Sequence, residues 1–446
     1  MYKRAIRRII SDPIHMPMIA VAYILVVVML FWGLYVSMDA AGSNTLQGSG
    51  IGGGGTGGAA SARENIVAVW IATVSNINYP SAVGLDSEQL SAELDEIVKN
   101  VKELGANTIF FQVRPCSDAL YDSDIFPPSS YVSGKRGEKA DGDFDSLSYL
   151  IGAAHSEGIA VHAWINPVRV LGGSQSNAAD LSSLCSDEPA ALHPEWTVQY
   201  DDGKIYYDLG IPEVRALIAE GVYEVVSRYA VDGVVFDDYF YPYPTRDKNG
   251  KLAEFDDAAT YKKYGGKLSL SDFRRESVNA LIRVCSIAVK KGNKAALFGV
   301  APFGIWRNST ELGGAGTSGL EAYSEIYCDA LAFAREGNVD YIAPQLYWGI
   351  GDPSADFSIL AEWWSNALLG TKTAFIPCLA AYRYSSGGYE SGELTEQLRR
   401  CLEADGYAGV ALYGYAALID DALSVGDELR FYSRYARSPT DNSHVH

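Results

Sequence analysis

The stretch Asp232–Phe240, DGVVFDDYF, reads as a short buried strand that ends in two acidic residues. Similar apolar and β-branched runs recur along the chain, separated by amphipathic segments that predict helices. The eight expected strands span residues 66–74, 107–115, 160–168, 232–240, 296–304, 340–348, 373–383 and 407–417. Eight consecutive strand–helix units, with no glycine-rich nucleotide-binding loop after an early strand, favour an α/β fold of the closed (β/α)8 (TIM barrel) type.

Polar and aromatic residues stand at the ends of these strands, where the chemistry of (β/α)8 barrels is located. Side chains alternate between the two faces of a strand, so residues two apart share a face. The groups that share a face are Gln112 with Arg114, His162 with Trp164 and Asn166, and Val235 with Asp237 and Tyr239. We expect the polar members of each group to point into the barrel mouth.

Asp237 and Asp238 are the strongest candidates for catalytic groups, because charged residues are rarely buried without a partner. Alternation predicts that only one of the two faces the barrel axis. Asp237 lies on the same face of the strand as Tyr239. This favours Asp237 as the catalytic carboxylate and Asp238 as an orienting neighbour or substrate ligand. The alternative for this pair is a helix N-cap or a salt bridge to Arg169.

A second acid is expected from another loop, because glycosidic hydrolysis usually uses two carboxyl groups that flank the bond. Asp118, on the loop after the second strand, is the best-placed candidate, followed by Asp208 and Asp352. The alternative for each is a solvated loop acid or a turn residue. The sequence leaves open whether the reaction retains or inverts the anomeric configuration.

Metal, cofactor and esterase chemistry find little support in the sequence. Apart from His444 and His446 at the end of the chain, the six histidines form no HxH spacing, and neither an HExxH nor a paired helical motif is present. No GxSxG turn is present either, so we predict neither a metal nor another cofactor. His162 is expected either to hydrogen-bond the catalytic carboxylate or to be a satisfied core residue. The cysteines lack metal-ligand spacing, and buried free thiols are expected at Cys285, Cys328 and Cys401.

Seven ordered blocks of sequence resemble the glycosyl hydrolase-like 10 family of bacterial extracytoplasmic proteins. They include VWIATVSNINYPS, VHAWINPVRV, YAVDGVVFDDYFYPYP and VDYIAPQLYW, and the resemblance runs from about residue 66 to about residue 432. It implies a (β/α)8 barrel with glycosidase-type activity on bacterial cell-wall glycan, including peptidoglycan strands without stem peptides. With the strand-end pattern, it predicts catalytic roles for Asp237, Asp238 and Asp118. The predicted substrate-binding residues are Gln112, Arg114, His162, Trp164, Asn166, Arg169, Asp208, Tyr239, Trp306, Arg307, Gln345, Tyr347 and Trp348.

The start of the chain differs from the rest. Residues 1–15 are basic, 16–38 contain no charged residue and match the roughly 20 residues that span a bilayer, and 39–62 are rich in glycine. We predict a cytoplasmic tail, a transmembrane helix and a flexible tether, followed by a glycosidase-like domain at 63–436 and a C-terminal tail at 437–446. The positive-inside rule places the domain outside the cytoplasmic membrane, with a cleaved signal peptide as the alternative.

The charge of the chain bears on its partners. It has 36 Lys and Arg against 55 Asp and Glu, a net charge of -19, which argues against nucleic-acid binding and favours neutral or weakly charged glycan. We expect a membrane-anchored glycoside hydrolase that cuts peptidoglycan, with cell-wall glycan and the cytoplasmic membrane as partners and no protein partner identified. The alternatives are a non-catalytic glycan-binding barrel and a glycosidase for an exopolysaccharide.

Overall fold

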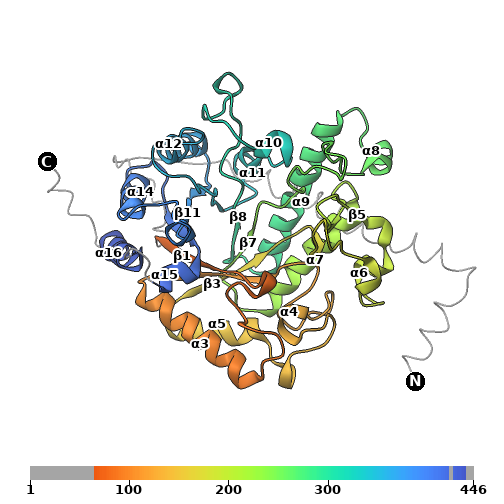
Figure 1. The fold of residues 1–446 in the computed structure, drawn as a ribbon, viewed down its shortest axis with the longest axis horizontal. Helices are drawn as coiled ribbons and strands as arrows, with labels where there is room; N and C mark the ends of the chain where they lie inside the picture. The colour runs from red at the N-terminus through yellow and green to blue at the C-terminus, as the bar shows by residue number, and fades with distance from the viewer. Residues whose placement is uncertain (1–64, 421–424, 438–446) are drawn as a thin grey trace, which may run out of the picture. The chain divides into compact units, whose positions relative to one another are not determined.

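The computed structural model describes residues 65–420 and 425–437, and nine parallel strands form the centre of this part of the chain (Figure 1). The strands are β1 (Ile66–Ile71), β2 (Thr108–Arg114), β3 (Ala160–Ile165), β7 (Gly233–Phe236), β8 (Leu297–Val300), β9 (Tyr341–Ile342), β10 (Ala374–Phe375), β11 (Cys378–Ala380) and β12 (Gly409–Tyr413). Every one of them lies inside an expected strand. The regular pairing is shorter than the apolar runs, and the seventh run divides into β10 and β11.

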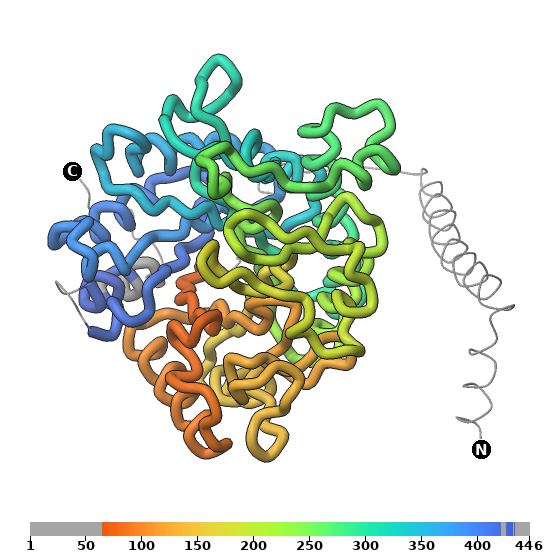
Figure 2. The backbone as a smooth tube through the Cα atoms, turned by 45° about the vertical axis from the view of Figure 1, so that its right-hand side comes forward, coloured from red at the N-terminus to blue at the C-terminus, as the bar shows by residue number. Residues whose placement is uncertain are grey.

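The parallel sheet curls toward a barrel. Its order is β10-β9-β8-β7-β3-β2-β1-β12-β11, and its edge strands β10 and β11 are separated in the sequence only by Ile376 and Pro377. An isolated bridge joins Gln345, which follows β9, to Cys378 of the edge strand β11. Because β1 pairs with β12, the orange-red start of the described chain lies beside its blue end in Figure 2. The fold is therefore TIM-barrel-like, as the sequence predicts.

Helices surround the strands in the described part of the chain (Figure 1). The outer helices are α3 (Ser87–Glu103), α5 (Ser146–Ser156), α7 (Pro212–Arg228), α9 (Leu270–Gly292), α11 (Ala330–Arg335), α12 (Phe357–Leu368), α14 (Glu393–Leu402) and α16 (Val425–Arg437). Shorter helices lie in the loops: α4 (Ser130–Ser133), α6 (Pro189–Leu192), α8 (Ala258–Tyr264), α10 (Ala322–Glu325), α13 (Tyr382–Ser385) and α15 (Tyr415–Ile419). Each strand of the barrel, with β10 and β11 taken together, is thus followed by one outer helix.

A small antiparallel sheet that the sequence analysis does not predict is inserted between β3 and α7. It consists of β4 (Arg169–Leu171), β5 (Thr197–Gln199) and β6 (Ile205–Tyr207), in the order β4-β6-β5. Its strands of three residues are too short to show alternation in the sequence. The insertion follows directly on the loop after β3 and so holds Arg169 near the carboxyl end of the barrel.

Helix α3 illustrates how local sequence sets the elements. Asp86 accepts a hydrogen bond from the backbone N–H of Gln89, and the Gln89 side chain accepts one from the backbone N–H of Asp86, which forms a capping box. The helix ends just before Gly105, whose φ of +76° favours glycine. One face of the helix is buried through Leu90, Leu94, Ile97, Val98 and Val101. Burial of each such side chain stabilises the fold by about 1.5–3 kcal/mol.

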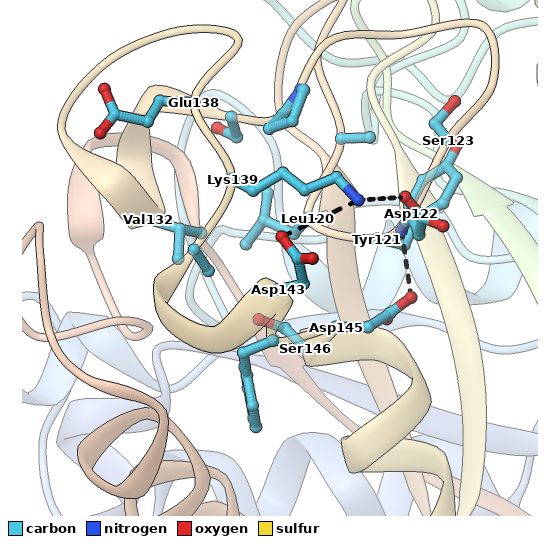
Figure 3. Close-up of a pocket in the computed structure, with 15 residues that line it drawn as sticks. Leu120, Tyr121, Asp122, Ser123, Val132, Glu138, Lys139, Asp143, Asp145 and Ser146 are labelled. Carbon is cyan, nitrogen blue, oxygen red and sulfur yellow. Dashed lines mark hydrogen bonds and ion pairs between the residues drawn. The ribbon is translucent and has the colours of Figure 1, made fainter.

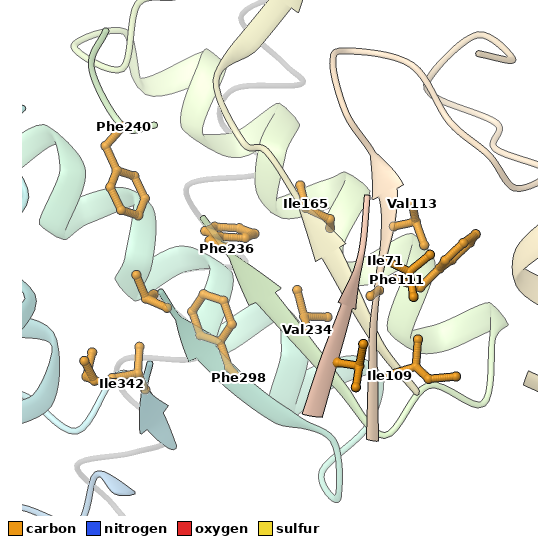
Figure 4. Packing of buried hydrophobic residues seen from close by; sticks show 14 of the residues in the cluster. Ile71, Ile109, Phe111, Val113, Ile165, Val234, Phe236, Phe240, Phe298 and Ile342 are labelled. Atoms are coloured by element: carbon orange, nitrogen blue, oxygen red, sulfur yellow. The ribbon is translucent and has the colours of Figure 1, made fainter. Parts of the chain in front are cut away.

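The side chains of the barrel strands form two separate clusters. Outward-facing residues such as Ile109, Val234 and Phe298 pack between the strands and the helices (Figure 4). The inward-facing residues form a second cluster of Ala68, Trp70, Ala72, Phe110, Trp164, Val235, Ala301, Tyr341, Ala343, Ile376, Cys378 and Ala411. This division follows the period-two alternation of strands, and it identifies which side chains can reach the inside of the barrel.

Two glycines leave room for large side chains inside the barrel. A Cβ atom at Gly233 would lie 2.7 Å from the imidazole of His162, and one at Gly299 would lie 2.0 Å from the ring of Tyr341. His162 Nδ1 and the Tyr341 hydroxyl are 2.9 Å apart and hydrogen bonded. This pair packs inside the barrel toward the amino ends of the strands, and a substrate site is expected at the carboxyl ends.

Several predictions concern residues that the structure does not describe. The predicted cytoplasmic tail, transmembrane helix and tether, and residues 438–446 of the C-terminal tail, lie outside the described residues. Within residues 65–420 and 425–437, no helix is both long and apolar enough to cross a membrane. All six cysteines are described and free, and Cys285, Cys328 and Cys401 are buried, so the prediction for their thiols is confirmed.

Candidate active site

A pocket of about 160 Å³ lies at the carboxyl ends of the barrel strands. It is lined by Trp70, Trp164, Asp237, Asp238, Tyr239, Gln345, Tyr347 and Tyr413. These residues come from β1, β3, β12 and the segments after β7 and β9, so the fold brings together side chains from the whole length of the chain. Six of the eight are predicted site residues, and the structure places them around one cavity.

Asp237 is the centre of this pocket. Strand β7 ends at Phe236, and Asp237 continues the inward face on which Val235 lies. Its side chain is buried, and its Oδ2 accepts hydrogen bonds from Trp164 Nε1 at 3.1 Å and from Asn166 Nδ2 at 3.2 Å. Its Oδ1 is buried and has no hydrogen-bond partner among the described residues. One carboxylate oxygen is thus held in place by two donors, while the other is buried without a partner in the described part of the chain.

The surroundings of Asp237 make it able to change protonation state near neutral pH. Burial is the largest influence and raises the pKa of Asp237 to about 7, against the opposing effect of the positive charge of Arg169. The neighbouring Asp238 raises this pKa further, and the hydrogen bonds from Trp164 and Asn166 lower it. A carboxyl group with such a pKa can donate a proton and take one back in the same reaction cycle.

Asp238 borders the same pocket, and the expectation that only one acid faces the site is wrong. Regular strand pairing stops at Phe236, so the alternation does not extend to Asp238. Its Oδ2 accepts a hydrogen bond from the Tyr243 hydroxyl. Burial raises the pKa of Asp238, while hydrogen bonds from Tyr243 and Gln345 lower it. These donors stabilise the ionised form of Asp238 and fix its orientation.

The turn after β3 supports Asp237 from one side. Asn166 Oδ1 accepts the backbone N–H of Arg169 at 2.9 Å, which orients its Nδ2 toward Asp237. The Arg169 side chain is buried, donates from Nε to the carbonyl of Pro115 at 3.0 Å and lies 5.2 Å from the centre of the Tyr239 ring. Arg169 therefore supplies a fixed positive charge behind the pocket.

Gln112 and Arg114 do not share a face, so the expectation that both point into the barrel mouth is wrong for Arg114. A register shift between these two residues, where β2 pairs with β3, sets Arg114 opposite the outward-facing Ile165. Its guanidinium lies 3.7 Å from the centre of the Phe126 ring. Gln112 stays on the inner side, where its Oε1 accepts the backbone N–H groups of Thr73 and Val74 and secures the loop after β1.

His162 lies deeper in the barrel than Asp237 and does not bond to it. Its Nδ1 is hydrogen bonded to Tyr341, and its ring stacks on Phe110 at 5.1 Å. Burial lowers the pKa of His162 to about 4, so the ring is neutral at physiological pH. It borders a cavity of about 590 Å³ at the amino ends of the strands. Of the two roles expected for His162, the structure shows the satisfied core residue.

The three candidates for a second acid do not line the pocket, and each accepts hydrogen bonds elsewhere. Asp118 accepts the backbone N–H of Cys116 and the hydroxyl of Ser129, and it lies 3.5 Å from the Arg136 guanidinium. Asp208 accepts the backbone N–H of Gly210, and Asp352 accepts those of Ser354 and Ala355 in a turn. The structure does not bring any of these acids beside Asp237.

A separate crevice of about 100 Å³ lies next to the loop that carries Asp118 (Figure 3). In it, Lys139 reaches Asp122 at 3.2 Å and Asp143 at 4.0 Å, and Asp145 accepts the backbone N–H of Asp122. Lys139 is therefore paired with two acids of the crevice. None of the predicted site residues lines this crevice.

Trp306 and Arg307 form their own cluster after β8. The Trp306 ring stacks on Trp363 at 5.7 Å, and the Arg307 guanidinium lies over the Trp306 ring at 4.9 Å. Trp306 Nε1 donates a hydrogen bond to Asp329 at 3.1 Å. Trp348 lies edge-on to Phe303 at 5.6 Å. These contacts hold the loops around the pocket, and none of the three predicted residues lines the pocket itself.

The sequence analysis missed two residues of the pocket, Trp70 and Tyr413. Trp70 lies edge-on to Trp164 at 4.9 Å, and Tyr413 stacks on Tyr347 at 6.0 Å with an interplanar angle of 18°. Tyr413 is the last residue of β12, a position that the rule of strand ends could have identified. The signal for Trp70 is weaker, because it stands inside a continuous apolar run.

Comparisons with known proteins identify the family of the chain. A family model described as glycosyl hydrolase-like 10 matches residues 65–390. The chain is 37% identical over 323 residues to glycosyl hydrolase YngK of Bacillus subtilis (strain 168), covering 72% of this chain and 61% of YngK. It is 38% identical over 329 residues to glycosyl hydrolase DigH of Escherichia coli (strain K12), covering 71% of this chain and 73% of DigH.

Among solved structures, the glycoside hydrolase domain of PgaB (BpsB) from Bordetella bronchiseptica aligns with a TM-score of 0.48 and 15% identity, over 82% of this chain and 98% of that domain. The chain spans less than two thirds of the length of YngK. The match of the family model and the identity to DigH confirm the resemblance seen in the sequence. The chain belongs to the glycosyl hydrolase-like 10 family.

Proposed function

We propose that this member of the glycosyl hydrolase-like 10 family is a glycoside hydrolase that cuts cell-wall glycan, with Asp237 as its general acid. The observation that carries the proposal is the environment of Asp237. It is a buried acid at the carboxyl end of a barrel strand, with a pKa of about 7 and an unpartnered Oδ1 in the pocket. General acids of glycosidases need a raised pKa, because the group must be protonated when substrate binds.

In this mechanism Asp237 donates its proton from Oδ1 to the glycosidic oxygen as the bond to the sugar breaks. Trp164 and Asn166 hold Oδ2 and stabilise the carboxylate that remains, together with the positive charge of Arg169. A hydrogen bond to a charged group contributes about 1.5–3 kcal/mol. The same carboxylate can then take a proton from the attacking water, which returns the site to its starting state.

The lining of the pocket suits a sugar ring. Trp70, Trp164, Tyr347 and Tyr413 offer aromatic surfaces for the apolar faces of a pyranose, and Gln345 offers an amide for its hydroxyl groups. The negative net charge of the chain favours neutral or weakly charged glycan. Peptidoglycan strands, including those without stem peptides, are the proposed substrate because of the resemblance to the glycosyl hydrolase-like 10 family.

The proposal also includes the location of the protein. Residues 16–38 are proposed to anchor the chain in the cytoplasmic membrane, with the barrel on the outer side next to the cell wall. The basic residues of the preceding segment support this orientation. Labelling of single introduced cysteines, at one position before residue 16 and one after residue 38, with a membrane-impermeant reagent tests it in intact cells. Labelling only after residue 38 is expected, and labelling only before residue 16 contradicts the orientation.

The proposed function is tested by incubating the purified full-length protein with peptidoglycan strands, with and without stem peptides, and with a neutral exopolysaccharide. Released fragments are identified by mass spectrometry. We expect fragments from peptidoglycan strands with wild type and with Asp256→Asn, an exposed acid after β7, and none with Asp237→Asn. Fragments from the exopolysaccharide alone would change the substrate, and binding to glycan without any cleavage would indicate a binding module.

A further inference from the structure

We infer that the sugar cut at this site carries a 2-acetamido group, and that the carbonyl oxygen of this group, not a protein side chain, is the nucleophile. The inference rests on the proposed glycosidase function, whose peptidoglycan substrate is N-acetylated, and deepens it by naming the nucleophile of the reaction. It starts from the positions of the carboxylates around the pocket.

Both carboxylates of the pocket come from consecutive residues at the end of one strand. Asp237 and Asp238 follow β7 directly, and successive Cα atoms are about 3.8 Å apart, so the two side chains reach a bound sugar from the same wall of the pocket. The other described residues that line it are aromatic or carry an amide. Glycosidases with a protein nucleophile or base need carboxyl groups that flank the scissile bond.

Among the described residues that line the pocket, no acid comes from another strand. Asp118 is bound within a network of Arg136, Ser129 and a backbone N–H, and it does not line the pocket. Arg136 is held in turn by Glu188, with Arg136 Nη2 and Glu188 Oε2 at 2.6 Å. Breaking a buried ion pair of this kind costs about 3–5 kcal/mol, so Asp118 is not free to turn toward the sugar.

The remaining acid, Asp238, is suited to a different task. Its Oδ2 is held by the Tyr243 hydroxyl, and Gln345 stabilises its ionised form. An oriented carboxylate beside the general acid can accept a hydrogen bond from the N–H of an acetamido group. This contact turns the acetamido carbonyl oxygen toward the anomeric carbon and stabilises the positive charge that the group gains during the reaction.

The reaction then proceeds in two balanced steps. In the first, Asp237 gives its proton to the leaving oxygen while the acetamido oxygen forms a bond to the anomeric carbon on the opposite face, and Asp238 stabilises the cyclic oxazolinium ion. In the second, water attacks the anomeric carbon, gives a proton to Asp237 and reopens the ring to the acetamide. The two displacements retain the configuration, and the first requires the leaving group and the acetamido group to be trans.

The aromatic wall provides a place for the acetamido methyl group. Trp70 and Trp164 meet edge to face at 4.9 Å, and Tyr413 stacks on Tyr347 in the same pocket. A methyl group gains from burial against such rings, while the N–H of the same acetamide faces Asp238. Sugars without the acetamido group would lose both contacts as well as the nucleophile.

The inference is tested with peptidoglycan strands that are chemically de-N-acetylated and then re-acylated with acetyl, fluoroacetyl or trifluoroacetyl groups. Fluorine withdraws electrons from the carbonyl oxygen, so the full-length protein should cut the trifluoroacetyl strand roughly 100-fold more slowly than the acetyl strand, with the fluoroacetyl strand between them. The free-amine strand should not be cut. Equal rates for the acyl series, or cleavage of the free-amine strand, would overturn the inference and leave the hydrolase function intact. Failure to cut any strand would overturn both.

A second measurement uses binding instead of turnover. A thiazoline analogue, in which sulfur replaces the ring oxygen of the cyclic intermediate, should bind the wild-type protein in calorimetry. Asp238→Asn should weaken this binding roughly tenfold or more, because the charged acceptor of the N–H is lost. Asp256→Asn removes an exposed acid of the same loop and should bind as the wild type does. No binding to wild type, or unchanged binding to a folded Asp238→Asn variant, would contradict the role of Asp238.

Discussion

Replacing Trp164 with phenylalanine should raise the pKa of Asp237 and move the pH dependence of the reaction. The indole Nε1 donates to Asp237 Oδ2 at 3.1 Å, and this bond favours the ionised carboxylate and lowers its pKa. In the wild type, Trp164 lies edge-on to Trp70 at 4.9 Å. Phenylalanine keeps an aromatic ring in this place and removes only the Nε1–H donor to Asp237. The change therefore acts mainly on the electrostatics of Asp237.

The size of the shift follows from the strength of one charge-assisted hydrogen bond. Such a bond contributes about 1.5–3 kcal/mol, and one pKa unit corresponds to about 1.4 kcal/mol. Asn166 still donates to the same oxygen at 3.2 Å, so the lower end of the range applies and the pKa rises by about one unit from about 7. A general acid acts only while protonated. The wild-type rate should therefore fall above about pH 7, and the rate of the variant above about pH 8.

Two assays measure this shift. The first is the pH profile of kcat/KM from released reducing ends, and the second is the titration of aspartate carboxyl carbons by NMR, assigned with Asp237→Asn. Trp363→Phe is a matched control, because its Nε1 donates to the carbonyl of Gly313 and not to the acid. A Trp164→Phe profile that coincides with the wild type, or that moves to lower pH, would refute the reasoning.

Three further predictions concern the surroundings of the site. Tyr243→Phe removes the hydroxyl donor to Asp238, so turnover on N-acetylated glycan should fall roughly tenfold while circular dichroism stays unchanged. Arg136→Met leaves the buried Glu188 without its ion pair, and urea unfolding should show a loss of about 3–5 kcal/mol; an unchanged midpoint would contradict the structure. Burial lowers the pKa of His162 to about 4, from 6.5 in the unfolded chain. The unfolded chain therefore binds a proton at a higher pH than the folded protein does, and stability is lost as the pH falls from 6.5 to about 4. Between pH 7 and pH 5, wild type should lose about 2 kcal/mol more than His162→Phe.

The position of Asp237 in the pocket could be predicted from the sequence for a local reason. The apolar run before Asp237 is short and regular. Because side chains alternate between the two faces of a strand, Asp237 and its hydrogen-bond donors Trp164 and Asn166 are all expected on the inner face of the barrel. Parallel strands of a barrel end at the same edge, so residues that are far apart in the sequence meet there. No knowledge of individual contacts was needed for this part of the site.

Where the prediction failed, the deciding contact is not local. The irregularity between Gln112 and Arg114 depends on how β2 pairs with β3, and no turn residue marks it in the sequence. The role of Asp118 depends on Arg136, which lies on another part of the loop. The parity argument also assumed that strand pairing continues to Asp238, whereas it stops at Phe236. Register and side-chain pairing of this kind require the folded chain.

The most direct test of the central claim compares two substrates in the Asp237→Asn variant. One is the natural glycan, whose leaving oxygen needs a proton, and the other is an aryl glycoside of the same sugar with a dinitrophenol leaving group, which does not. The account predicts a loss of roughly 100- to 10,000-fold on the glycan and a much smaller loss on the aryl glycoside. Equal losses on both substrates, in a variant that is folded, would contradict the assignment of Asp237 as the general acid.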